Sequence, residues 1–440
     1  MTTPASDTST RLAEWQQAYA DLQSLGLKLD LTRGKPSAEQ LDLSDALLAL
    51  PGAGTVTDAD GTDVRNYGGL DGLPQIRRIF AELLDVPVAQ LLAGGNASLT
   101  LMHDTLAFAM LFGLPGSERP WSREEKVRFV CPVPGYDRHF TLCEAFGIEM
   151  VTVPMTADGP DAEAVAALVA DDPSIKGMWV VPTYANPDGS VVSREVAQRL
   201  VSMPAAAPDF RIMWDNAYAV HHLTDVETES APALALAAEA GNPDRVLLYA
   251  STSKITFPGA GVAFLGSSPA NISWYKKHLA AQSIGPDKVN QLRHAEFFGD
   301  AEGVRAHMRK HRDVIAPKFE AVDTILRERL GTDGVASWTA PLGGYFVSLD
   351  VVPGTAARVV QLAKEAGIAL TPAGATFPYG KDPQDANIRL APTLPPLDEV
   401  RVAIDGVATC VLLAAAEKAA ADGGELVQDT VDADGRDRLR

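Results

Sequence analysis

The chain has 440 residues, of which 46% are hydrophobic and 22% are charged, and this composition excludes a wholly disordered or fibrous protein. The formal charge is −19, from 38 Lys and Arg against 57 Asp and Glu, which argues against nucleic acids and anionic membranes as partners. The sequence has no signal-like start, no apolar run of about 18 residues, and three cysteines without metal or redox spacing. We therefore expect a cytoplasmic protein with one large core and a smaller one.

The N-terminal residues carry an amphipathic pattern. Leu12, Trp15, Tyr19 and Leu22 recur at steps of three and four before Gly26, which predicts a helix that ends at this glycine. Short apolar runs then alternate with helical stretches. Because these runs lack polar alternation, they predict an α/β fold with a largely parallel sheet covered on both faces. The expected strands are 127–133, 178–181, 212–214, 246–250 and 262–265.

The chain after about residue 300 predicts a second, smaller α+β domain. A helical pattern covers 307–330, strand-like segments follow around 345–352 and 387–390, and an alanine-rich helix is expected near 402–421. We expect four parts: a segment 1–60 that packs with the small domain, a large domain over 61–310, a small domain over 311–422, and a disordered tail over 423–440.

Polar side chains follow four of the predicted strands. Open α/β sheets bind ligands at the carboxyl ends of their strands, and here these ends carry Tyr136, Asn186, Asp215 with Tyr218, and Lys254. A desolvated lysine can act as an amine nucleophile, and a buried carboxylate can keep a pyridine nitrogen protonated. The set therefore predicts a pyridoxal phosphate site, with Tyr136 stacked on the ring and Asn186 and Tyr218 at its hydroxyl group.

A glycine-containing turn before an apolar helix offers a place for the phosphate. Residues 94–98 read Gly-Gly-Asn-Ala-Ser and precede the helix expected over 99–112. Glycines allow close approach, and a helix N-terminus directs N–H groups and the positive end of its dipole at an anion. We therefore expect Asn96, Ala97 and Ser98 to line the phosphate site.

Four motifs occur in the chain: Asn-Pro-x-Gly at 186–189, Asp-x-x-Tyr at 215–218, Ser-x-Ser-Lys at 251–254 and Asn-x-Arg at 387–389. Their order and separations resemble those of class I aminotransferases, and the resemblance covers nearly the whole chain. It is strongest to a bacterial aspartate aminotransferase subgroup with Asn-Tyr-Gly-Gly, here 66–69, and Ser-Thr-Ser-Lys-Ile-Thr-Phe-Pro-Gly, here 251–259. The resemblance implies the fold type I architecture of pyridoxal phosphate enzymes, with a mostly parallel seven-stranded sheet in the large domain.

The resemblance also implies a role for each motif residue. It implies Lys254 as the Schiff-base lysine and proton shuttle, Asp215 as partner of the pyridinium with His139 hydrogen-bonded to it, and Arg389 at the substrate α-carboxylate. Tyr67 resembles the tyrosine that reaches the phosphate of the neighbouring subunit, which implies a homodimer with shared active sites. The remaining implied contacts are Tyr136, Asn186 and Tyr218 at the ring, Asn96, Ala97, Ser98, Ser251 and Ser253 at the phosphate, and Gly34, Asn186 and Arg33 at the substrate.

The sequence departs from the family pattern at two places. The family's Asn-Pro-Thr-Gly has Asp188 in place of the threonine. The stretch after the lysine normally ends in Gly-x-Arg, whose arginine binds the phosphate, but it reads Gly-Ala-Gly at 259–261, without Lys or Arg from 255 to 275. A buried dianion without a cation is costly. We therefore predict a basic side chain from elsewhere at the phosphate, near Lys381 or in the loop 32–37.

The leading function is transamination between L-aspartate and 2-oxoglutarate. The alternatives are a transaminase for aromatic amino acids, kynurenine or a broad range of donors, a β-lyase, and a ligand-sensing regulator domain. The residues before Thr32 are too few for a DNA-binding module, which disfavours the regulator. A dicarboxylic donor needs a cation for its distal carboxylate, and four residues remain candidates for it: Arg33, Lys35, Arg138 and Lys288.

His307 and His311 have the spacing of metal ligands on a helix. They lack the glutamate of a zinc protease motif and stand among Arg305, Arg309 and Lys310. We interpret the pair as part of a solvated helix face and expect no metal.

Overall fold

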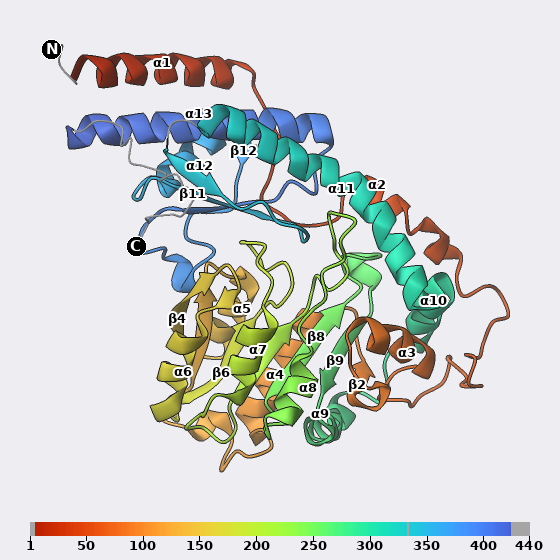
Figure 1. The fold of residues 1–440 in the computed structure, drawn as a ribbon. Coiled ribbons are helices and arrows are strands. Elements are labelled where there is room, and N and C mark those ends of the chain that lie inside the picture. Colours follow the sequence, from red (N-terminus) through yellow and green to blue (C-terminus); the bar gives the residue numbers. More distant parts are fainter. Residues whose placement is uncertain (1–4, 332–333, 424–440) are drawn as a thin grey trace.

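The computed structural model describes residues 5–331 and 334–423. From edge to edge, the described part of the large sheet in the lower half of Figure 1 contains β2 (Leu91–Ala93), β9 (Ala263–Ser267), β8 (Val246–Ser251), β7 (Arg211–Asp215), β6 (Ile175–Val180), β3 (Arg128–Val133), β4 (Glu149–Thr156) and β5 (Gly159–Pro160). The five strands from β8 to β4 are parallel, β9 is antiparallel to both neighbours, and β5 is antiparallel to β4. The predicted mostly parallel sheet is confirmed, with the two-residue β5 in addition to seven strands.

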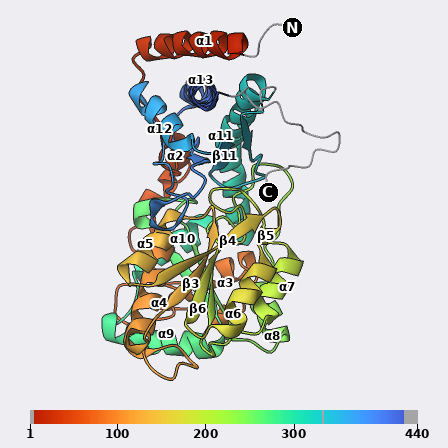
Figure 2. The same cartoon turned by 90° about the vertical axis from the view of Figure 1, so that its left-hand side faces the viewer.

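Successive residues of the central strands point into different apolar clusters. In β7, Ile212 and Trp214 belong to one cluster and Met213 to another, so the strand is apolar throughout. Helices therefore cover both faces of the sheet (Figure 2). One face is covered by α3 (Pro74–Leu83), α6 (Ala162–Asp171), α7 (Arg194–Ser202) and α8 (Ala233–Glu239), and the other by α4 (Ser98–Phe112), α5 (Asp137–Ala145) and α9 (Pro269–Gln282).

The order of the strands reverses at β3. This strand pairs with β4 on one side and with β6 on the other, although β4 precedes β6 in the chain. Such a reversal leaves a crevice at the carboxyl ends of the strands, where open α/β sheets bind their ligands.

A second core contains segments from both ends of the chain. Tyr19 and Leu22 of α1 (Ala5–Ser24) are buried in it, and α1 lies beside α13 (Leu397–Asp422) at the top of Figure 1. β1 (Leu29–Asp30) pairs in parallel with β12 (Ile368–Ala369). The core also includes a three-stranded antiparallel sheet of β10 (Ala336–Trp338), β11 (Val347–Val351) and β13 (Asn387–Leu390), covered by α12 (Ala356–Glu365).

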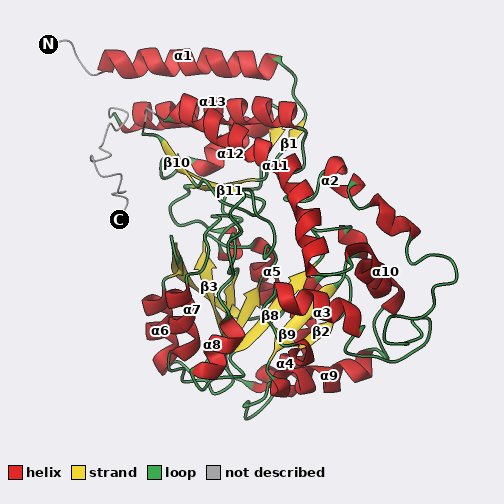
Figure 3. Ribbon diagram, turned by 45° about the vertical axis from the view of Figure 1, so that its right-hand side comes forward, coloured by secondary structure: helices red, strands yellow, loops and turns green. Residues whose placement is uncertain are grey.

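The long helix α11 (Ala301–Leu330) connects the two cores (Figure 3). Val304 and Met308 pack in the first core, whereas Ile315 and Leu326 pack in the second.

The expected disordered tail, 423–440, lies outside the described residues from 424 onward. The remaining helices are α2 (Ala38–Asp42), α10 (Lys288–Phe298), and the short 3-10 helices Asp45–Ala49, Val88–Gln90, Trp121–Arg123, Pro258–Ala260 and Pro378–Gly380.

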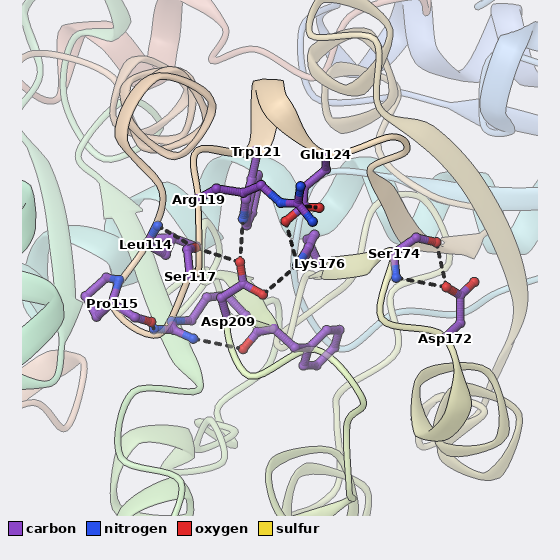
Figure 4. A network of polar contacts seen from close by, with 12 residues as sticks. Leu114, Pro115, Ser117, Arg119, Trp121, Glu124, Asp172, Ser174, Lys176 and Asp209 are labelled. Carbon is purple, nitrogen blue, oxygen red and sulfur yellow. Dashed lines mark hydrogen bonds and ion pairs between the residues drawn. The ribbon is translucent and has the colours of Figure 1, made fainter.

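A buried polar network lies at the N-terminal ends of the central strands, across the sheet from the crevice at their carboxyl ends (Figure 4). Asp209, just before β7, accepts hydrogen bonds from Lys176 Nζ at 2.9 Å, Ser117 Oγ at 2.6 Å and the Trp121 indole at 2.8 Å. The charge of Asp209 is therefore fully partnered, and the network attaches the loop between α4 and β3 to the sheet.

No helix within the described ranges has the length and apolarity to cross a bilayer.

Candidate active site

Asp215 ends β7 with its carboxylate buried. Its Oδ2 lies 3.0 Å from Nε2 of His139 in α5, and the His139 ring stacks on the Trp179 indole with 4.2 Å between centroids. Its Oδ1 is also buried and has no hydrogen-bond partner in the described part of the chain. Because an unpaired buried oxygen is costly, this geometry provides an acceptor for a donor that the chain does not supply.

Lys254 follows β8 and approaches the same place. Its Nζ lies 4.8 Å from the centre of the Tyr218 ring. Burial lowers the pKa of Lys254, and the negative charge of Asp215 partly opposes this shift. Burial raises the pKa of Tyr218, so its phenol remains a donor. A lysine with a lowered pKa supplies a neutral amine more readily, as a nucleophile requires.

A cavity joins these groups to Tyr136 and Asn186. Burial raises the pKa of Tyr136, and the charge of Asp215 acts in the same direction. The structure thus brings together the residues that follow β3, β6, β7 and β8, as their position after parallel strands predicts. The cavity is lined by Ser98, Leu99, Met102, Tyr136, Val181, Asn186, Asp215, Ala217, Tyr218 and Lys254.

Arg389 comes to Asn186 from the small sheet. Its Nη1 donates to Asp137 Oδ1 at 2.7 Å and to Asn186 Oδ1 at 3.4 Å. Its Nε is buried and finds no acceptor among residues 5–331 and 334–423. The guanidinium lies 4.9 Å from the centre of the Phe346 ring. The Nε edge is thus left for an added acceptor, and a carboxylate is the group that pairs best with a guanidinium.

Gly34 lies against the same Phe346 ring. A Cβ at Gly34 would collide with this ring, so the loop 32–37 needs glycine for its close approach. The side chains of Arg33 and Lys35 in this loop are exposed, as is that of Arg138. Gly34 therefore reaches the surroundings of Arg389, whereas the three cations remain on the surface.

The N-terminus of α4 lies at the expected phosphate site. Ala97 is the N-cap residue and Ser98 the first helical residue, and no side chain in the described part of the protein caps the helix. Its first N–H groups are therefore available to an anion, with the positive end of the helix dipole behind them.

The hydroxyl groups of Ser251 and Ser253 lie beside this turn. They hydrogen-bond to each other at 3.1 Å, and Ser253 Oγ lies 3.4 Å from the backbone oxygen of Asn96. Gly261 borders the same place, because the atoms nearest to a Cβ there are Asn96 O, Thr252 Oγ1 and Ser253 N. These three atoms carry no positive charge, so none of them replaces the arginine that the family pattern has in place of Gly261.

Tyr67 lies on an exposed loop, with 82% of its surface accessible. Buried Lys288 holds this loop, because its Nζ donates to the backbone oxygens of Asn66 at 2.6 Å and Gly68 at 2.8 Å. Two of the three N–H groups of Lys288 are thus used by the loop.

The interpretation of His307 and His311 as a solvated face is wrong. They are only 5% and 1% exposed, and their Nε2 atoms lie 3.1 Å apart. The charged neighbours in sequence misled the prediction, because in a helix they lie on other faces. The described side chains hold no group of three possible metal ligands.

Sequence reasoning missed three neighbours of the site. They are Trp179 under His139, Asp137 on Arg389, and Phe346 between Gly34 and Arg389. Trp179 and Phe346 lie in apolar stretches that indicate only a core. Of the three, only Asp137 could have been suspected from the sequence, because it directly follows the predicted site residue Tyr136.

These residues fit pyridoxal phosphate. The free Oδ1 of Asp215 suits a protonated ring nitrogen, Lys254 suits the aldehyde, and the uncapped start of α4 suits the phosphate.

Comparison with known proteins supports the same conclusion. An aspartate aminotransferase of Corynebacterium glutamicum is 60% identical over 402 residues, which are 91% of this chain and 93% of that protein. A protein of Mycolicibacterium smegmatis with an aminotransferase name is 63% identical over 404 residues, or 91% of this chain and 94% of that one.

Solved structures agree with these relatives. The crystal structure of an aspartate transaminase from Corynebacterium glutamicum has a TM-score of 0.93 at 58% identity, covering 94% of this chain and 97% of that one. An alpha-aminoadipate aminotransferase from Thermus thermophilus, solved with N-(5'-phosphopyridoxyl)-L-leucine, shares the fold with a TM-score of 0.71 at 21% identity, covering 88% and 93%. The family described as aspartate amino-transferase matches residues 3–423. The chain therefore belongs to the aspartate amino-transferase family, and the predicted fold, aminotransferase activity and pyridoxal phosphate cofactor are confirmed.

Proposed function

We propose that the chain transfers the amino group of L-aspartate to 2-oxoglutarate and forms oxaloacetate and L-glutamate. The observation that carries the site is Asp215 Oδ1, which has no partner among the described residues and lies in the same cavity as Lys254. The aspartate aminotransferase name of the relative at 60% identity supports the choice of donor. The three free, buried cysteines fit a reducing cytoplasm, where we place the enzyme.

When bound, pyridoxal phosphate would supply an aldehyde that is reactive toward amines and a ring that withdraws electrons. Lys254 would hold the aldehyde and, as a neutral amine, would move a proton to and from the substrate α-carbon. Asp215, oriented by His139, would hold a proton on the ring nitrogen, and the protonated phenol of Tyr218 would donate to the ring oxygen. Arg389 binds the α-carboxylate through its free Nε edge while Asp137 and Asn186 hold Nη1.

We infer that the active form is a homodimer. Exposed Tyr67 shares a face with exposed Ile284 and Val289, since Gly285 packs against the backbone of Gly68. Such a face suits a second copy of the chain, which would bring its tyrosine to the phosphate site. The basic side chain expected at the phosphate stays a prediction.

The lysine assignment is tested by borohydride reduction of the loaded enzyme followed by peptide mass spectrometry. We expect the cofactor to be attached to Lys254 in the natural sequence and to be absent from Lys254→Ala, which has no measurable turnover. Lys277→Ala, at an exposed lysine, is the matched control and keeps both properties. A reducible link that persists in Lys254→Ala would contradict the assignment.

The donor is tested separately with aspartate, alanine, phenylalanine and kynurenine, each with 2-oxoglutarate as acceptor, and with glutamate, for which oxaloacetate is the acceptor. We expect the highest kcat/KM for aspartate and glutamate, and a loss with every donor in Arg389→Ala, because all donors share the α-carboxylate. A preference for phenylalanine or kynurenine would reject aspartate and leave transamination intact.

A further inference from the structure

The backbone around Lys254 is held by side chains that do not line the cavity. The carbonyl oxygen of Lys254 accepts a hydrogen bond from the Tyr345 hydroxyl at 3.3 Å, and His221 Nε2 lies 3.4 Å from it. The carbonyl oxygen of Ile255 lies 2.9 Å from Nε2 of His307. The carbonyls of the catalytic lysine and of the residue after it are thus both held in place.

The helix α2 determines the direction of these hydrogen bonds. The backbone N–H of Ser37 donates to Gln40 Oε1 at 3.1 Å, in a capping box that fixes which end of the amide faces inward. The inward Nε2 of Gln40 donates to Tyr345 Oη at 2.9 Å and lies 3.0 Å from His311 Nδ1. Because Tyr345 accepts from Gln40, its own proton is free for the carbonyl of Lys254.

The same amide selects the tautomer of His311. Since Gln40 Nε2 only donates, His311 Nδ1 accepts, and the proton of the neutral ring is on Nε2. This Nε2 lies 3.1 Å from His307 Nε2, and both rings hydrogen-bond to the backbone of Ile255, whose carbonyl oxygen has two lone pairs. Burial lowers the pKa of His311 to about 3, and His307 adds to the shift, so the ring remains neutral.

We propose that Gln40 is a positioning residue for Lys254. Its amide orients Tyr345 and His311, and these two side chains hold the Lys254–Ile255 peptide in the conformation that presents the amine to the cavity. Because α2 directly follows the loop 32–37, the same amide connects the lysine to the segment that packs on Phe346 beside Arg389. This inference rests on the proposed role of Lys254.

The isosteric variant Gln40→Glu tests the direction of the hydrogen bonds. A carboxylate inside the network accepts where the amide donates, so Tyr345 turns its proton away from Lys254 and His311 takes its proton onto Nδ1. We expect kcat to fall between about tenfold and a hundredfold, as for a small displacement of a reacting group, with KM for aspartate within about threefold. Gln384→Glu, at an exposed glutamine, is the matched control and keeps the natural kcat.

Two further measurements separate positioning from loss of folding. When the absorbance of the lysine-bound cofactor is titrated against pH, its midpoint should shift in Gln40→Glu and in Tyr345→Phe, which removes the hydroxyl that donates to Lys254 and accepts from Gln40. Hydrogen exchange of the cofactor-free protein should accelerate at the amides after Lys254 in both variants. An unchanged kcat and midpoint, or a lower Tm with natural kinetics per bound cofactor, would overturn the proposal. If the assignment of Lys254 as the cofactor-binding lysine is itself wrong, the borohydride experiment on Lys254→Ala shows this separately.

Discussion

Asp188, where the family pattern has threonine, shows how burial changes the protonation of a single residue. Its Oδ1 accepts hydrogen bonds from Ser190, from the backbone N–H at 3.1 Å and from the hydroxyl at 3.0 Å. Burial nevertheless raises the pKa of Asp188 from 3.8 to about 6, because the hydrogen bonds offset the desolvation only in part. The folded chain therefore holds this proton more tightly than the unfolded chain.

We expect Asp188→Asn to stabilise the protein near pH 8 and to leave it unchanged below about pH 4. Between the two pKa values the folded state binds more protons, so the natural protein loses stability as the pH rises through this window. At about 1.36 kcal/mol per pKa unit, the effect at neutral pH reaches up to about 3 kcal/mol. Tm measured against pH checks this, with exposed Asp158→Asn as control. A difference in Tm that does not depend on pH would contradict the assignment.

At the scale of elements, the attachment of the N-terminal segment depends on Gly367. This residue follows α12 with φ of +82°, and its carbonyl accepts the N–H of Leu29 at 2.9 Å. A Cβ at Gly367 would collide with the backbone oxygen of Leu27. Glycine is thus required both by the left-handed conformation and by the close approach of β1 to β12.

We expect Gly367→Ala to lower the free energy of unfolding by more than about 2 kcal/mol, from about 1 kcal/mol for the positive φ plus the separation of β1 from β12. Gly26→Ala is the matched control, since Gly26 has φ of +60° and no described atom lies within 4 Å of a Cβ there. This variant should lose only the contribution of the positive φ to the free energy of unfolding. Denaturant unfolding measures both variants. Equal losses would show that the collision with Leu27 is relieved without cost.

At the scale of the whole molecule, the exposed Tyr67 predicts that a complete site needs two chains. We expect Lys254→Ala and Tyr67→Ala chains, each defective alone, to recover activity when they are unfolded and refolded together. A mixed dimer then contains one site with both residues intact. Mixing Lys254→Ala with Lys254→Arg is the control and recovers nothing. Activity no higher than the sum of the separate variants would contradict a shared site.

The sequence by itself predicted five strands of the large sheet, but not β2, β4 or β5, and predicted that polar residues gather at one edge of it. Apolar runs without alternation indicate strands buried on both faces, and all five expected strands are present. Because parallel strands place their carboxyl ends at one edge, chain order alone brings Asp215 and Lys254 together. The domain boundaries near 61 and 311 stay predictions, and residue 311 falls inside the continuous helix α11.

Only the tertiary structure decided which polar groups have partners. It pairs Arg389 with Asp137, joins Lys288 to the Tyr67 loop, and gives Asp215 Oδ1 no partner within residues 5–331 and 334–423. It also buries His307 on α11, because helical spacing shows which residues share a face but not which face the rest of the chain covers. Hydrogen-bond partners and burial depend on atoms far apart in sequence, so periodicity and motif order do not contain them.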